Sequence, residues 1–212
     1  MLKKIIIFVG IGCISLLIFT MISHRVIVTQ QVIEEAHPIA TIHFSNGESI
    51  KMELYPEQAP NTVRNFIYLA EKDFYNGTFI NRVIPGYFIQ LGDPIGNGYG
   101  YPGYFIKSEC KYNGVRNRLT HTKGTVSMAR SSAFDTEGCQ FFILLEDDKS
   151  LDGQYASFGR VIEGIESLEN MGTIELDENY LPRESITIDS LELEFNNYNI
   201  ANLESVIAGD ED

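Results

Sequence analysis

One short segment of the chain combines a cation, an amide and two aromatic rings. Arg82 stands in an otherwise apolar run, and Tyr87, Phe88 and Gln90 follow it closely. Burying an arginine is costly unless an anion or a strongly polar group meets it, and no acidic residue follows until Asp93. The pattern therefore predicts a hydrogen-bond donor beside an apolar pocket, aimed at a ligand carbonyl or amide. The alternative is a structural arginine that pairs with a distant carboxylate.

The other reactive side chains show no spacing typical of a metal or nucleophilic site. The histidines are scattered, and neither Cys110 nor Cys139 belongs to a Cys-x-x-Cys motif. A disulfide between these two cysteines is chemically possible outside the cytoplasm, but their spacing does not establish one. A nucleophilic pair of Cys139 with His121 has no local support. We therefore expect neither a metal nor a cofactor.

The glycines at positions 96, 98 and 100 have the density of a phosphate-binding loop. A phosphate cradle needs a helix directly after the glycines, and no Lys-Ser/Thr pair supports one here. We therefore predict a surface loop over residues 92–103.

The net charge excludes one class of partner. The chain of 212 residues carries -13 at pH 7. Residues 1–25 hold three cations and no acid, which leaves 13 basic against 29 acidic residues in the remainder, a net charge of -16. Such a body repels phosphates, so we expect no nucleic-acid partner.

The N-terminus has the pattern of a membrane anchor. Lys3 and Lys4 precede an uncharged apolar run over residues 5–23, which is long enough to cross a bilayer as a helix. The lysines should stay cytoplasmic and place the body outside. We predict a transmembrane anchor over residues 1–23 and a stalk over 24–37, with the domain at the cell membrane. The alternative is a secreted protein released by signal cleavage.

Periodicity predicts the elements that must position the segment around Arg82. Two alternating runs joined at Asn46-Gly47 predict a β-hairpin over residues 39–54. An apolar stripe from Val63 to Phe74 predicts a helix beginning near Pro60. A strand is expected over residues 78–90, and further short strands over 124–129, 140–145, 155–161 and 186–191. A short helix is expected over 165–171, and residues 195–212 read as a solvated acidic tail. Many short strands with two helices suggest a closed or nearly closed antiparallel sheet.

A set of short motifs occurs in a fixed order over residues 38–194. They are Tyr75-Asn-Gly-Thr, Arg82-Val-Ile-Pro-Gly, Gln90-Leu-Gly-Asp, Gly124-Thr-Val-Ser-Met-Ala, Gln140-Phe-Phe-Ile, Leu151-Asp-Gly and Phe158-Gly-Arg-Val-Ile-Glu-Gly. In this order and close to this spacing they resemble the cyclophilin-type peptidyl-prolyl isomerases. The loop rich in Gly, Pro and Tyr resembles the bacterial branch of that family.

The resemblance implies a mainly β fold, a closed eight-stranded antiparallel β-barrel capped by two α-helices, which catalyses rotation about Xaa-Pro bonds. We expect the protein to be a monomer. It implies that Arg82, Gln90 and Phe142 are catalytic. By the same resemblance, proline-containing polypeptides would be bound by Tyr87, Phe88, Ala129, Arg130, Gln140, Leu151 and Tyr155. The chemistry is consistent, because a donor aimed at the prolyl nitrogen stabilises the twisted amide more than either planar form.

Several positions depart from the family pattern. They are Ile80, Asn81, Tyr87, Phe88, Leu91, Arg130 and Ser150. None of them removes the Arg82 donor, so they concern rate and substrate preference more than the reaction. Two functions therefore stay open at this point. One is an active isomerase that assists the folding of exported proteins, and the other is a peptide-binding module or holdase chaperone with little turnover.

Overall fold

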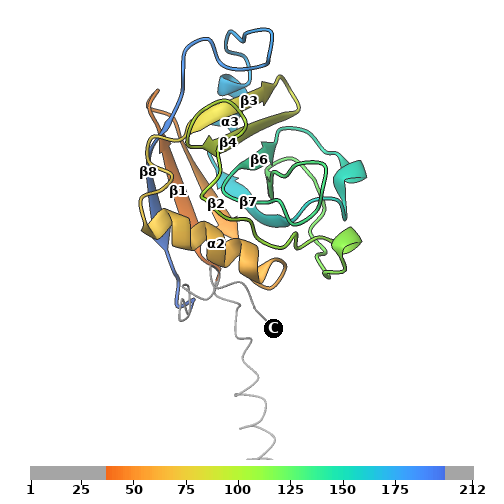
Figure 1. Ribbon diagram of the computed structural model, residues 1–212. Coiled ribbons are helices and arrows are strands. Elements are labelled where there is room, and N and C mark those ends of the chain that lie inside the picture. The colour runs from red at the N-terminus through yellow and green to blue at the C-terminus, as the bar shows by residue number, and fades with distance from the viewer. Residues whose placement is uncertain (1–36, 199–212) are drawn as a thin grey trace, which may run out of the picture. The chain divides into compact units, whose positions relative to one another are not determined.

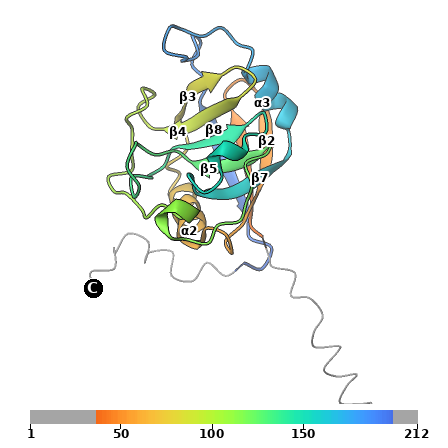
Figure 2. The same ribbon diagram turned by 90° about the vertical axis from the view of Figure 1, so that its right-hand side faces the viewer.

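The computed structural model describes residues 37–198, which form one compact unit. Eight strands build one antiparallel sheet in the order β3-β4-β6-β5-β7-β2-β1-β8. The strands are β1 (Ile39–Phe44), β2 (Ser49–Leu54), β3 (Phe79–Ile84), β4 (Phe88–Asp93), β5 (Thr125–Met128), β6 (Phe141–Leu144), β7 (Ser157–Glu163) and β8 (Ile188–Glu194). The helices are α2 (Pro60–Glu71) and α3 (Ile165–Met171), with short 3-10 turns η1 (Lys111–Asn113) and η2 (Lys149–Leu151). The sheet curls around the core, and the two helices lie toward opposite ends of it (Figures 1 and 2).

The expectation of a closed barrel was wrong. β3 and β8 are the two edges of the sheet, and no continuous ladder joins them. They approach each other at an isolated bridge between Phe79 and Thr187, with a few backbone hydrogen bonds on either side. The N–H groups of Gly77 and Ile80 donate to the carbonyls of Ile188 and Ile186, and the Ile188 N–H donates to the Thr78 carbonyl, so the contact between the two edges covers only a few residues. The fold is an open half-barrel, and the two predicted helices are present.

The first hairpin is confirmed, and its cause is local. Alternate residues of β1 and β2 point into the core, with Ile42 paired across to Ile50 in register. A period of two in side-chain polarity fixes which face is buried, because a slip by one residue would turn every apolar side chain outward.

Helix α2 is confirmed too, although it ends at Glu71, before Phe74. Its apolar stripe is buried, with Val63 and Phe66 fully inaccessible. Ala59 provides no side-chain cap. Instead the buried Glu109 carboxylate accepts bonds from the Asn61 and Thr62 backbone N–H groups, at 3.2 and 2.8 Å. A distant loop thus satisfies the first turn of α2.

The strand predicted over residues 78–90 is in fact two strands. Ile84-Pro85-Gly86-Tyr87 forms a tight turn, closed by the Tyr87 N–H donating to the Ile84 carbonyl at 2.9 Å. Gly86 has φ +72°, which a glycine adopts without strain. The Pro-Gly pair was the available signal for this turn. Because of it, β3 and β4 lie side by side and Arg82 pairs with Gln90.

The remaining element predictions differ mainly in their bounds. The strand expected over 155–161 begins at Ser157, and the final strand runs to Glu194. Of the surface loop expected over residues 92–103, Gly92 and Asp93 belong instead to β4, and residues 94–103 form no strand or helix. The predicted anchor, most of the stalk and most of the acidic tail lie outside the described residues. Within residues 37–198, no helix is long and apolar enough to span a bilayer.

Candidate active site

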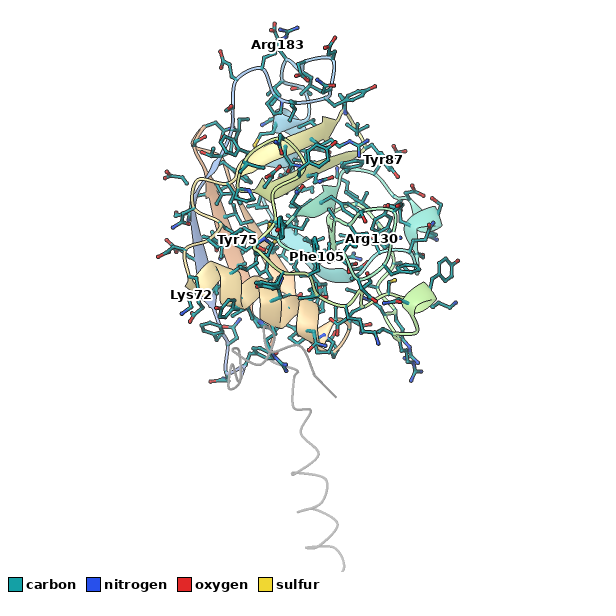
Figure 3. The ribbon with its side chains drawn as sticks, in the orientation of Figure 1. Lys72, Tyr75, Tyr87, Phe105, Arg130 and Arg183 are labelled. Carbon is teal, nitrogen blue, oxygen red and sulfur yellow. The ribbon has the colours of Figure 1, made fainter. Side chains whose placement is uncertain are left out.

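One cavity gathers all but one of the residues singled out from the sequence. It has a volume of about 190 Å³ and is lined by Arg82, Tyr87, Phe88, Gln90, Ala129, Arg130, Phe142, Leu151 and Tyr155. Tyr87 and Arg130 lie on the same side of the molecule (Figure 3). Gln140 does not reach this cavity. Residues more than sixty positions apart in sequence meet here because β4 pairs with β6, which pairs with β5.

Strand register places the three expected catalytic residues in one row. Arg82 on β3 is opposite Gln90 on β4, and Gln90 is opposite Phe142 on β6. Residues that face each other across an antiparallel pair project from the same side of the sheet. Their neighbours Ile89, Leu91 and Phe141 fill the core, so this row lies on the outer face of the half-barrel.

The Arg82 side chain is exposed, contrary to the expectation of a buried arginine. Its guanidinium carbon lies 5.3 Å from the centroid of the Phe88 ring, a cation–π distance. Within residues 37–198 no carboxylate pairs with it, so the alternative of a structural ion pair is not what the fold contains. The guanidinium therefore keeps its hydrogen-bond donors available at the mouth of the cavity.

Aromatic rings form the walls of the cavity. Phe142 lies 5.8 Å from Phe88 and 5.3 Å from Tyr155, measured between ring centroids. The Tyr87 and Phe88 rings meet edge to face at 5.2 Å. The cavity, at about 190 Å³, is smaller than the sites of drug-sized ligands, which are usually about 300–1,000 Å³. Its size and its aromatic walls therefore suit a small apolar ring.

The Tyr87 hydroxyl is fixed by the loop that follows β6. It donates to Asp148, whose other oxygen accepts from the Ser150 N–H at 2.9 Å. Partial burial and this bond together raise the pKa of Tyr87 to about 12. The hydroxyl therefore stays protonated, and the ring presents its apolar face to the cavity.

Gln90 lines the cavity, whereas the Gln140 side chain bonds to other groups of the protein. Gln140 accepts from Gln90 and from Asn81, both at 2.8 Å, and donates to the Gly98 and Gly100 carbonyls. All the polar atoms of the Gln140 amide are thus used within the protein. Gln140 thus fixes the Gln90 amide, and it lines the adjoining hollow that also contains Gln90, Ala129 and Arg130. Asn81, at an atypical position, shares that task.

Ala129 and Arg130 follow the end of β5. The Ala129 N–H donates to the Gln140 carbonyl at 2.9 Å, so pairing with a substrate strand would have to use the Ala129 carbonyl. The Arg130 guanidinium lies between the rings of Phe134 and Tyr155, at 4.6 and 4.8 Å. It also donates to the Gln154 carbonyl. Arg130 thus braces the cavity wall.

Other hollows of the described domain include one beside this cavity and a larger one away from it. A cavity of about 360 Å³ shares Gln90, Ala129 and Arg130 with the site and continues along the loop containing Tyr99, Tyr101 and Phe105. Sequence reasoning missed these aromatic residues, whose only signal was their density. A larger hollow of about 690 Å³ lies at residues 173–186. It lacks the combination of a free cation, an amide and aromatic walls, so we assign the site to the smaller cavity.

The described residues are not arranged for the other chemistries that the sequence analysis considered: a disulfide, a nucleophilic Cys–His pair, a phosphate-binding loop and a metal site. Cys110 and Cys139 are separate, buried, free thiols. His121 bonds to Asp152 and two serines and not to Cys139. In the glycine-rich loop the N–H groups of Ile95 and Gly98 bind the Asp93 carboxylate, which occupies the place of an anion. Among the described residues no cluster of His, Cys, Asp and Glu is arranged to hold a metal.

Comparison with known proteins agrees with this geometry. The family model for "Cyclophilin type peptidyl-prolyl cis-trans isomerase/CLD" matches residues 39–193. Peptidyl-prolyl cis-trans isomerase B of Bacillus subtilis is 48% identical over 126 residues, which cover 59% of this chain and 85% of that protein. A peptidyl-prolyl cis-trans isomerase of Helicobacter pylori is 40% identical over 134 residues, covering 62% of this chain and 78% of that one.

A solved structure shows the same fold. The cyclophilin-type isomerase of Cryptosporidium parvum, crystallised in the presence of the dipeptide Ala-Pro, superposes with a TM-score of 0.67 at 30% identity. The match covers 74% of this chain and 98% of that one. Fold, motif order and sequence identity lead to the same conclusion: this chain belongs to the cyclophilin-type peptidyl-prolyl cis-trans isomerases, the rotamase enzymes.

Proposed function

We propose that this isomerase turns Xaa-Pro bonds by holding the proline ring in the cavity while the Arg82 guanidinium donates to the prolyl nitrogen. The observation that carries the proposal is the row of Arg82, Gln90 and Phe142, with a cation that no carboxylate of the described domain neutralises. The reaction needs no covalent intermediate.

The rate of the uncatalysed reaction is set by the amide bond. Rotation about an X-Pro bond meets a barrier of about 20 kcal/mol, because resonance is lost at the twisted state. The lone pair then localises on the prolyl nitrogen, where a fixed donor can bind it. A donor that acts on developing charge in this way commonly contributes about 10²- to 10³-fold in rate. Arg82 stabilises the twisted state selectively, since the planar amide nitrogen is a poor acceptor.

The walls would supply substrate binding. Phe88, Phe142 and Leu151 offer an apolar surface for the proline ring, and the Ala129 carbonyl is suited to pair with an extended backbone. The Tyr155 hydroxyl can donate a hydrogen bond to the substrate carbonyl. Proline-containing polypeptides are therefore the proposed substrates, and the solved relative crystallised with Ala-Pro supports this ligand class.

An isomerisation assay on the fragment that starts at Pro38 tests the mechanism. Arg82→Ala should lower kcat/KM by about 10²-fold, whereas its affinity for proline peptides should change little. Arg82→Lys, which keeps the charge but loses the forked donors, should fall between the two. If wild type is no faster than Arg82→Ala while still binding proline peptides, the chain is instead a binding module or holdase.

We further propose that residues 1–23 anchor a monomeric domain on the outer face of the cell membrane, where exported proteins would be its clients. The support is the Lys3-Lys4 pair followed by the apolar run. Surface proteolysis of intact cells tests the topology: the domain should be cleaved without lysis. A protected domain would contradict the external placement, and recovery in the medium would favour signal cleavage.

A further inference from the structure

A buried polar cluster continues the catalytic row beyond the cavity. Phe142 on β6 is opposite Ser127 on β5, and Ser127 is opposite Ser157 on β7. Both serine hydroxyls contact Nε2 of His121, at 3.0 and 3.1 Å. On the other side of the ring, Nδ1 lies 3.0 Å from Oδ1 of Asp152.

These residue types are those of a hydrolase triad, but their burial excludes that chemistry. His121, Ser127 and Ser157 are at most 1% exposed. A substrate carbonyl could not reach either hydroxyl, so neither serine can act as a nucleophile. The cluster can therefore affect only the structure of the protein around it, and not a substrate directly.

The hydrogen bonds define one orientation for the imidazole. A carboxylate only accepts, so Nδ1 carries the proton that is shared with Asp152. Nε2 then accepts from a serine hydroxyl, and both ring nitrogens are satisfied. Burial lowers the pKa of His121, against the opposing effect of Asp152, so the ring is neutral at neutral pH.

The fixed ring contacts the walls of the cavity from behind. It stacks on Phe142 with an interplanar angle of 16° and a centroid distance of 6.3 Å. It also meets the edge of Tyr155 at 6.4 Å. Its backbone carbonyl accepts from the Asp148 N–H at 3.0 Å, and Asp148 is the acceptor of the Tyr87 hydroxyl.

We propose that His121 is a positioning residue for the isomerase reaction. It sets the plane of Phe142 and ties that ring to the segment of residues 148–155, which provides the opposite wall. This inference rests on the proposed site, since it takes Phe142 and Tyr155 to face the substrate. Loss of the fixed orientation should leave the cavity in place but spoil its alignment with Arg82.

Asp152 offers a matched pair of variants for the test. Its Oδ1 accepts both from the His121 backbone N–H, at 2.7 Å, and from Nδ1. Asp152→Asn can keep both bonds through its carbonyl oxygen, whereas Asp152→Ala loses both. In the full-length chain in detergent, we expect Asp152→Ala to lower kcat about tenfold with KM changed less than about threefold, and Asp152→Asn to stay within about twofold of wild type.

Proton NMR reports the hydrogen bond directly. A protected imidazole N–H resonance should be present in wild type and in Asp152→Asn, and absent in Asp152→Ala. Glu109→Ala, which removes the distant cap of α2, serves as a control for lost stability and should leave kcat unchanged below its melting temperature.

Three outcomes would overturn the inference. These are an unchanged kcat in Asp152→Ala although the resonance is lost, equal impairment of the Asn and Ala variants, or an equal fall of kcat in Glu109→Ala. Failure of the proposed site is distinguishable, because Arg82→Ala would then retain its activity.

Discussion

Tyr87 shows how one side chain divides its parts between the cavity and the scaffold. Its ring forms a wall of the site, and its hydroxyl donates to Asp148. The two functions separate chemically, since phenylalanine keeps the ring and loses only the bond.

We therefore expect Tyr87→Phe to keep kcat/KM within about threefold of wild type, with a stability loss of about 1 kcal/mol from the missing bond. Tyr87→Ala should lower kcat/KM at least tenfold, because a missing apolar contact in a small pocket costs about 1–3 kcal/mol. Steady-state isomerisation and thermal melts measure both effects. Equal loss in the two variants would mean that the hydroxyl, and not the ring, is the contact that matters.

The ionised form of Glu137 lowers the stability of the folded state. It is fully buried; Ser108 donates to one of its carboxyl oxygens, and the other has no hydrogen-bond partner. Burial raises the pKa of Glu137 to about 7 from 4.5. The folded protein therefore binds more protons than the unfolded chain between these two values.

At the scale of elements, helix α2 depends on a loop far away in sequence. The Glu109 carboxylate accepts from Asn61, from the Thr62 N–H and from the Thr62 hydroxyl, the last at 2.9 Å. A carboxylate at a helix N-terminus satisfies orphan N–H groups and meets the positive end of the helix dipole.

Removing this long-range cap should destabilise the domain without changing the site. We expect Glu109→Ala to lower the free energy of unfolding by about 1–3 kcal/mol, because buried donors lose their partner. The free energy of unfolding should fall less in Glu109→Gln, because the amide oxygen of glutamine still accepts a hydrogen bond. Urea melts of the two variants check this. A cost within error of zero for Glu109→Ala would show that water replaces the carboxylate.

At the scale of the whole molecule, Glu137 should shape the pH dependence of stability. Because its pKa is higher in the folded state, the contribution of Glu137 to the free energy of unfolding falls as pH rises from 4.5 to about 7, by up to about 3 kcal/mol, and is constant at higher pH. His121 acts in the opposite sense: its pKa is lowered, so its contribution is lost as pH falls below about 6.5.

Glu137→Gln isolates the first effect. Between pH 5 and pH 8 the variant should lose less stability than wild type, since only the wild type ionises a buried acid. Melting temperatures at several pH values test this prediction. Parallel curves for variant and wild type would assign the dependence to other groups.

The sequence by itself determined those features that depend on local periodicity. The hairpin of β1 and β2 follows from alternation, and α2 follows from the apolar stripe that contains Val63 and Phe66. Ordered motifs indicated the family and named the residues that line the cavity. These predictions were possible because each depends on residues that are close together in the sequence.

Only the tertiary structure decided how distant segments meet. It left the barrel open between β3 and β8, placed the Arg82 side chain in solvent and directed the Gln140 amide to partners within the protein. It also placed His121 behind Phe142. The physical reason is strand register: which side chains touch across β3, β4, β6, β5 and β7 depends on pairings between residues far apart in sequence, and local patterns do not encode those pairings.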